Sequence, residues 1–251
     1  MLLTIGCVFG VLALIPYALH IQSAQLEQTK PPMPLWLLIL LQLAQNTVLF
    51  GFMGFLGLYL ADRTGFEQPI LEDMVSGNQW MKKYLNQLPQ AILLGVIASV
   101  FIILLDVFVF MGAQASAQEM HISTPPWWKG LLASFYGAIN EEVFARLFLI
   151  SLIVFLTQKI LKRKTDEPTE YVIWMAIGLS SVLFGLGHLP ATLSADIPLN
   201  YFIVVRAIVL NSIAAIPFGW LYWKKSLAAA MSAHFTADIV LHVLLPLAAA
   251  G

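Results

Sequence analysis

The chain has 251 residues, of which 59% are hydrophobic and only 11% are charged. Soluble proteins carry about 25% charged residues, and the mean hydropathy of +0.82 also excludes a soluble domain. The formal net charge of -1 gives no information about partners, and no basic tract suggests nucleic-acid binding. Cys7 is the single cysteine and lies in a predicted membrane span, which excludes disulfides and thiolate metal sites.

Runs of about 20 apolar residues recur along the whole length, as is typical of a polytopic α-helical membrane protein. The predicted fold is therefore all-α, a transmembrane helix bundle with about seven spans. The expected spans are Leu2–Leu19, Leu35–Ala61, Pro89–Met111, Trp127–Thr157, Tyr171–Leu189, Leu199–Trp223 and Leu227–Leu247. The first run lacks a basic n-region, so we expect a retained span rather than a signal peptide. Asp62 to Leu88 is expected to be a polar loop, and Gly112 to Thr124 a link.

We divide the chain into residues 1–125, with three spans and the polar loop, and residues 126–251, with the other four. Loops that follow even-numbered spans carry nine basic residues, whereas Lys30 and Lys129 are those of the odd-numbered loops. The nine are Arg63, Lys82, Lys83, Lys159, Lys162, Arg163, Lys164, Lys224 and Lys225. The positive-inside rule then predicts a multi-pass protein of the inner or plasma membrane with a cytoplasmic N-terminus.

Two adjacent carboxylates and an arginine interrupt the fourth span at Glu141, Glu142 and Arg146. Ionisable side chains at bilayer depth are costly and indicate a functional site. On a helix, Glu142 and Arg146 share a face because they are four residues apart, so they are expected to neutralise each other. Glu141 points elsewhere and is expected to be available for chemistry.

Further polar groups lie in the later spans. In the fifth span, His188 follows Phe184 by four residues, and in the seventh, His234 and Asp238 share a face. The carboxylate of Asp238 is placed to orient or charge the imidazole of His234. For Asp106 in the third span two interpretations are about equally favoured: it belongs to the site, or it makes a structural hydrogen bond. The sixth span holds two more polar residues, Arg206 and Asn211.

A glutamate and two histidines from three helices predict a convergent polar cluster. Such a set could activate a water molecule, with Glu141 as base, one histidine sharing the water and the other stabilising an oxyanion. Glu141, His188 and His234 could instead hold a divalent metal such as Zn²⁺. Asp, Glu and His chains also relay protons in transporters, which keeps a proton-coupled transporter as an alternative. No internal repeat of the kind found in transporters is visible.

The motifs Glu141-Glu142-x-x-x-Arg146, Phe184-x-x-x-His188 and His234-x-x-x-Asp238 occur in this order on successive helices. Together they resemble the CPBP family of intramembrane proteases, which includes the CAAX prenyl endopeptidases and bacteriocin-processing enzymes. The resemblance extends from about Trp127 to Leu245. It implies a protease of the glutamate-dependent or metallo-endopeptidase type.

The resemblance also implies a role for each matching residue. Glu141 would activate water with His188, and Glu142 with Arg146 would form a supporting pair. His234 and the residue four later would stabilise the oxyanion or bind metal. Many family members have asparagine at that last position, where this chain has Asp238, so its oxyanion role is in question.

The sequence therefore predicts an endopeptidase that cleaves a membrane-delivered or lipidated peptide, of the prenylated CAAX type or the signal or bacteriocin type. Membrane lipids and this peptide are the expected partners. A non-catalytic immunity or binding protein that keeps the motifs is the other alternative. Straight helices would leave the three motifs at different depths, so we expect tilt, or a break near Gly185, Gly187 and Pro190, to bring them together.

Overall fold

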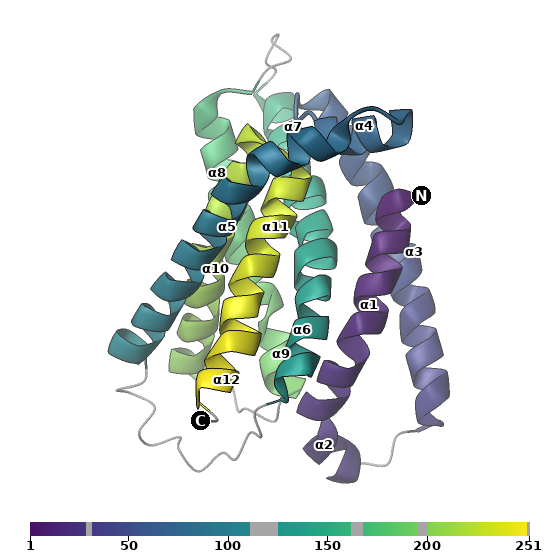
Figure 1. Ribbon diagram of the computed structural model, residues 1–251, viewed down its shortest axis with the longest axis vertical. Helices are drawn as coiled ribbons and strands as arrows, with labels where there is room; N and C mark the ends of the chain where they lie inside the picture. Colours follow the sequence, from purple (N-terminus) through teal and green to yellow (C-terminus); the bar gives the residue numbers. More distant parts are fainter. Residues whose placement is uncertain (29–31, 111–124, 162–167, 195–199, 250–251) are drawn as a thin grey trace.

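The computed structural model describes residues 1–28, 32–110, 125–161, 168–194 and 200–249. Within these ranges the chain is helical and has no strand. Seven helical runs there are long and apolar enough to cross a membrane: Leu2–Ile21, Leu35–Arg63, Trp80–Phe110, Trp127–Ile160, Glu170–Leu193, Tyr201–Lys224 and Leu227–Ala249. The predicted all-α bundle of seven spans is confirmed (Figure 1).

Four of these runs are built from α-helix. They are α1 (Leu2–Ile21), α3 (Leu35–Arg63), α8 (Glu170–Gly187) with the short α9 (Leu189–Ser194), and α10 (Tyr201–Lys224). The two short helices between spans are α2 (Ser23–Gln28) and α4 (Pro69–Ser76).

The other three runs contain π-helical segments, in which hydrogen bonds join residues five apart. The first is α5 (Trp80–Leu105) with η1 (Asp106–Phe110). The second is α6 (Trp127–Tyr136), η3 (Gly137–Glu141), η4 (Val143–Ile150) and α7 (Ser151–Ile160). The third is α11 (Leu227–Ile239), η5 (Val240–Leu244) and α12 (Leu245–Ala249).

The prediction that Asp62 to Leu88 is a loop is wrong for much of this segment, because it contains α4 and the first turns of α5. Polar side chains hold these turns against α11. The Tyr84 and Ser232 hydroxyls lie 3.0 Å apart, and Ser226 donates to Gln87 at 2.6 Å. Hydropathy does not register such contacts. The predicted link Gly112–Thr124 and the basic residues Lys30, Lys162, Arg163 and Lys164 lie outside the described residues.

The central helices surround the segment that carries the Glu-Glu motif. Helix α11 packs against α5, α10, α6 and η3, while α1 packs against α6 and η3. Helix α3 lies along η4, and α8 packs against α10 and η4. Figure 1 shows α1 and α3 on one side of this centre and α5 on the other. The motif is thereby enclosed by helices from both halves of the chain.

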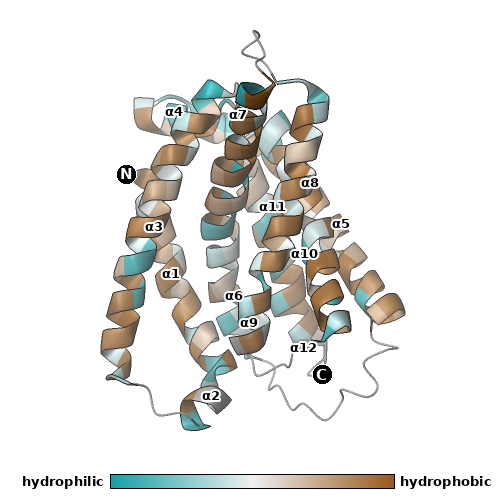
Figure 2. Cartoon of the chain, turned by 180° about the vertical axis from the view of Figure 1, so that it is seen from behind, coloured by the Kyte–Doolittle hydropathy of each residue, from teal (hydrophilic) through white to brown (hydrophobic). Residues whose placement is uncertain are grey.

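The outer faces of the bundle are apolar. Phe55 is 74% exposed and Phe108 is 78% exposed, and both lie in spans. Figure 2 shows that hydrophobic residues predominate along the long helices. Large exposed apolar side chains suit contact with acyl chains. The chain is therefore an integral membrane protein.

The two termini lie at opposite ends of the bundle (Figure 1). Arg63, Lys159 and Lys224 stand at or near the ends of α3, α7 and α10, on the end where the chain begins. These three basic residues follow or end even-numbered spans and lie at the same end of the bundle, in agreement with the loop counts, whereas Lys129 lies at the start of α6. The cytoplasmic location of that end stays a prediction.

Candidate active site

The carboxylates of the Glu-Glu motif lie where the long helix Trp127–Ile160 is π-helical. Glu141 ends η3, and Glu142 stands between η3 and η4. π-helical turns are rare and are frequently found at functional sites. Glu142 is fully buried, whereas the Glu141 side chain is 23% exposed. The two adjacent carboxylates therefore have different environments, as the sequence predicts.

Glu142 forms a buried ion pair with Arg146. Their Oε1 and Nη1 atoms are 3.0 Å apart, and both side chains are at most 1% exposed. Arg146 Nη2 donates to the Ala215 carbonyl at 3.2 Å, and its guanidinium lies 5.1 Å from the Phe184 ring and 5.5 Å from the Phe218 ring. The predicted pairing of Glu142 with Arg146 is confirmed. The ion pair is not perfectly aligned, since Arg146 Nη1 and Glu142 Oε2 each lack a hydrogen-bond partner.

His234 is held by Glu142. Its Nδ1 is 2.7 Å from Glu142 Oε1, and its ring stacks on Phe218 with centroids 5.1 Å apart. A carboxylate that pairs with an arginine is an acceptor, so Nδ1 carries the proton and donates it. The sequence suggested Asp238 as the orienting partner of this histidine. The structure gives the short hydrogen bond to Glu142 instead.

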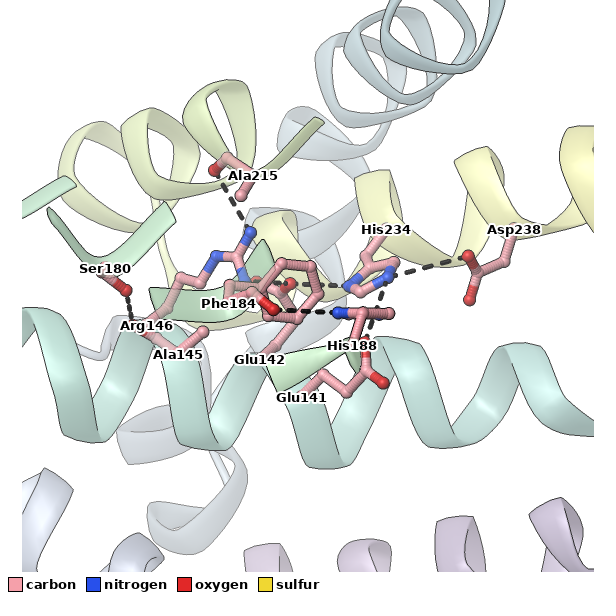
Figure 3. A network of polar contacts seen from close by, with 10 residues as sticks. All are labelled: Glu141, Glu142, Ala145, Arg146, Ser180, Phe184, His188, Ala215, His234 and Asp238. Atoms are coloured by element: carbon pink, nitrogen blue, oxygen red, sulfur yellow. Dashed lines mark hydrogen bonds and ion pairs between the residues drawn. The ribbon is translucent and has the colours of Figure 1, made fainter. Parts of the chain in front are cut away.

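The opposite ring nitrogen of His234 faces two further carboxylates. Nε2 is 3.7 Å from Glu141 Oε2 and 3.7 Å from Asp238 Oδ1. These separations exceed a direct hydrogen bond and suit groups that share a third polar atom. Figure 3 shows both carboxylates approaching the same side of the imidazole. Glu141, His234 and Asp238 are thus gathered as predicted.

His188 ends α8 and belongs to a face of that helix that packs on η4. Ser180, two turns earlier, donates to the Ala145 carbonyl at 2.7 Å. Phe184 follows, with its ring 4.6 Å from the His188 ring and 6.0 Å from the His234 ring. His188 Nδ1 donates to the Phe184 carbonyl oxygen at 2.9 Å. One aromatic ring therefore contacts both imidazoles of the predicted site.

The helical run of the fifth span is interrupted at His188, near the position at which the sequence predicts a break. Helix α8 ends at Gly187, and α9 begins at Leu189. His188 therefore sits at a helix end inside the bundle and next to Phe184, although it is near the end of its span in sequence. The predicted break near Gly185, Gly187 and Pro190 is confirmed.

Two features of the site were not singled out from the sequence. A Cβ atom at Gly137 would meet the carboxylate of Asp238 and would lie 3.2 Å from His234 Nε2. His242 Nε2 lies 3.9 Å from Asp238 Oδ1, on the side away from His234. Both could have been found from their spacing along the helix. Gly137 precedes Glu141 by four residues and His242 follows Asp238 by four, so each shares a helix face with a predicted site residue.

Other polar residues of the spans pair elsewhere. Arg206 binds Asp106 through two hydrogen bonds of 2.7 Å, which join η1 to α10. Asn211 donates to the Ala207 carbonyl of its own helix at 2.8 Å. Of the two alternatives considered for Asp106, the structure supports a structural hydrogen bond rather than a place in the site.

The predicted metal ligands do not form a metal centre in the described part of the chain. No three His, Cys, Asp or Glu side chains there are arranged around one possible ion position. Nδ1 of His234 and Nδ1 of His188 hydrogen-bond to Glu142 and to the Phe184 carbonyl, so Nε2 of each ring is the nitrogen left for a further partner. As they are arranged among the described residues, Glu141, His188 and His234 do not surround one ion position and do not fit a three-ligand site of the hydrolase type.

The comparison with protein families gives one match. Residues 123–240 match the Rce1-like family, described as "Type II CAAX prenyl endopeptidase Rce1-like". The matched segment contains all three motifs of the site. No curated protein and no solved structure gives a significant match.

Proposed function

Because residues 123–240 match the model of the Rce1-like family of type II CAAX prenyl endopeptidases, we propose that this chain is an intramembrane endopeptidase in which Glu141 activates the attacking water. The observation that carries the proposal is the 3.7 Å separation between Glu141 Oε2 and His234 Nε2. Groups at this distance can hold one water molecule between them. Glu142 is unsuited to the role because Arg146 and His234 already occupy it.

The reaction begins when Glu141 removes a proton from the water and the oxygen attacks the carbonyl carbon of the peptide bond. His188 assists from the end of α8. Its Nδ1 proton is donated to the Phe184 carbonyl, so Nε2 of the neutral ring is left as an acceptor for the same water. Glu141 then passes its proton to the amide nitrogen. The C–N bond breaks, and the products are a carboxylate and an amine.

His234 stabilises the negative charge that develops on the carbonyl oxygen. Its Nδ1 proton is donated to Glu142, so a second proton on Nε2 makes the ring a cation that can donate to the oxyanion. The stacked Phe218 ring and the buried carboxylate keep the imidazole in place before the substrate arrives. Such preorganised donors contribute about 10²–10³ in rate.

The substrate class follows from the location of the site. The reacting groups lie within helices whose outer faces are apolar, so the cleaved segment must be delivered at the membrane. A lipidated peptide of the prenylated CAAX type meets this requirement, as does a signal or bacteriocin peptide. The apolar part of either would lie among acyl chains while its peptide bond reaches Glu141.

The test is cleavage by the full chain in liposomes, read by mass spectrometry. The probes are peptides with an S-farnesyl cysteine three residues from the C-terminus and the same peptides without the lipid. Glu141→Gln should lower the rate by about 10²–10⁴, because the general base is lost. Glu170→Gln is the matched control, since that glutamate is 76% exposed and pairs with Lys224.

A chelator arm addresses the metal separately. The proposed mechanism predicts that cleavage persists after exhaustive chelation, with Glu141→Gln still inactive. Wild-type rates in Glu141→Gln, with equal folding, would disprove the role of this residue. Loss of cleavage on chelation, with recovery on adding Zn²⁺, would replace the mechanism by a metal-dependent one.

A further inference from the structure

His242 lies one turn beyond Asp238, just outside the residues that match the family. We propose that His242 is a positioning residue, which holds the Asp238 carboxylate and balances its charge so that it does not oppose the oxyanion. The inference rests on the proposed function of the site. It explains how an aspartate can stand where a neutral side chain would suit the reaction better.

The charges of the cluster do not balance without His242. In the proposed mechanism the carboxylates of Glu141, Glu142 and Asp238 carry negative charge, and Arg146 and His234 carry positive charge. Three negative and two positive charges leave a net charge of -1 in a largely buried place. Uncompensated charge is strongly unfavourable there. One more cation at Asp238 makes the sum zero.

His242 is placed to supply that cation. Its Nε2 is 3.9 Å from Asp238 Oδ1, the oxygen that lies 3.7 Å from His234 Nε2. The two histidines therefore flank one carboxylate oxygen from opposite sides along the helix. The His242 side chain is 43% exposed, compared with 8% for His234, so it is the less enclosed of the two imidazoles.

Neighbouring helices fix the position of His242. A Cβ atom at Gly130 of α6 would meet the His242 carbonyl oxygen and would lie 3.1 Å from its Cβ, so the two helices touch at this point. The Tyr17 ring of α1 lies edge-on with its centroid 6.0 Å from the imidazole. His242 therefore has Asp238 from its own helix and the Tyr17 ring of α1 near its imidazole, and Gly130 of α6 against its backbone.

The consequence for the reaction concerns the transition state. With His234 on one side and His242 on the other, the Asp238 carboxylate interacts with these two imidazoles along α11 and η5 rather than with the substrate carbonyl. When His242 is neutralised by substitution, the unbalanced charge of Asp238 acts against the oxyanion. Substrate binding does not develop that charge, so the loss should appear in kcat rather than in KM.

The test measures kcat and KM of the full chain in liposomes on the S-farnesylated peptide. His242→Gln should lower kcat about tenfold to hundredfold and change KM less than about twofold. His242→Lys keeps a positive charge and should retain more than half of the wild-type kcat. In an Asp238→Asn background, His242→Gln should change kcat less than about twofold, because the amide carries no charge to balance.

Two results would overturn the inference. One is an unchanged kcat in His242→Gln, and the other is an equal loss in the glutamine and lysine variants, which would mean a packing role. The comparison of these two variants decides the matter even if Asp238→Asn is inactive. Cleavage by wild type but not by Glu141→Gln, with His242→Gln fully active, would defeat this inference alone. No cleavage by wild type would defeat the proposed function and this inference together.

Discussion

Replacement of Arg146 by methionine tests the buried ion pair on which the site is built. Methionine keeps much of the volume between the Phe184 and Phe218 rings but removes the charge and the donors. Glu142, fully buried, would keep its charge without its cation. Breaking a buried pair in this way costs about 3–5 kcal/mol. Arg146→Met should therefore lower the thermal midpoint by about 6–20 °C, at about 2–4 °C per kcal/mol for a chain of this size.

Arg206→Met is the matched control, because it removes the same side chain from a pair in a different environment. Arg206 and Asp106 are 34% and 25% exposed. Because this pair is only partly buried, its loss should lower the midpoint by less than the loss of the fully buried pair in Arg146→Met. The assay is thermal unfolding of both variants in one detergent, followed by tryptophan fluorescence and by the soluble fraction after heating.

A double variant separates the unpaired charge from the lost packing. Glu142→Gln with Arg146→Met removes both charges and should recover part of the loss seen in Arg146→Met alone. Equal shifts for Arg146→Met and Arg206→Met would refute the reasoning from burial. So would a double variant that is less stable than the single one by the full cost of Glu142→Gln.

Two further predictions concern a glycine and a surface pair. Gly137→Ala should leave the protein folded but lower kcat at least tenfold, because the new Cβ would displace the Asp238 carboxylate. The control is Gly178→Ala, which should change neither activity nor folding because a Cβ there has nothing within 4 Å. Equal activity of the two variants in the peptide assay would contradict this prediction. The pKa of Asp73 lies below its ordinary value because the Lys83 side chain hydrogen-bonds to it. That stabilisation is present above the ordinary pKa and is lost as the pH falls through the lowered one. Asp73→Asn should thus reduce the thermal midpoint at neutral pH, and this difference should shrink as the pH falls below the ordinary pKa of about 3.9. A pH-independent difference would exclude the ion pair as its cause.

Hydropathy was sufficient to predict the spans because the bilayer imposes a length and a composition on each of them. The boundary at Trp80 was not predictable in this way. The turns from Trp80 to Leu88 contain Lys82, Lys83 and other polar residues, and they are helical because Tyr84 and Gln87 reach polar partners near the start of α11. Such contacts between distant segments have no periodic signal in a single sequence.

The site shows the same division between local and distant relations. Spacing by four residues predicted the Glu142–Arg146 pair and the shared face of His234 and Asp238, since both follow from helix geometry. The hydrogen bond from His234 to Glu142 joins side chains 92 residues apart, and no spacing rule could supply it. The catalytic roles assigned to these residues stay predictions until variants are assayed.

The polar cluster is most exposed at His242 and fully buried at Glu142 and Arg146. Side-chain exposure falls from 43% at His242 to 14% at Asp238 and 1% at Arg146. Beyond Arg146 the next described polar pair, Ser151 and Tyr222, is buried, neutral and closed on itself by a 2.8 Å hydrogen bond. A hydrolase embedded in a bilayer must admit water to its middle without letting ions drain from one compartment to the other. Water that entered from the His242 end would meet the buried guanidinium of Arg146 beyond Glu141. A site closed in this way could be supplied with water from a single face while the electrical insulation of the membrane is kept.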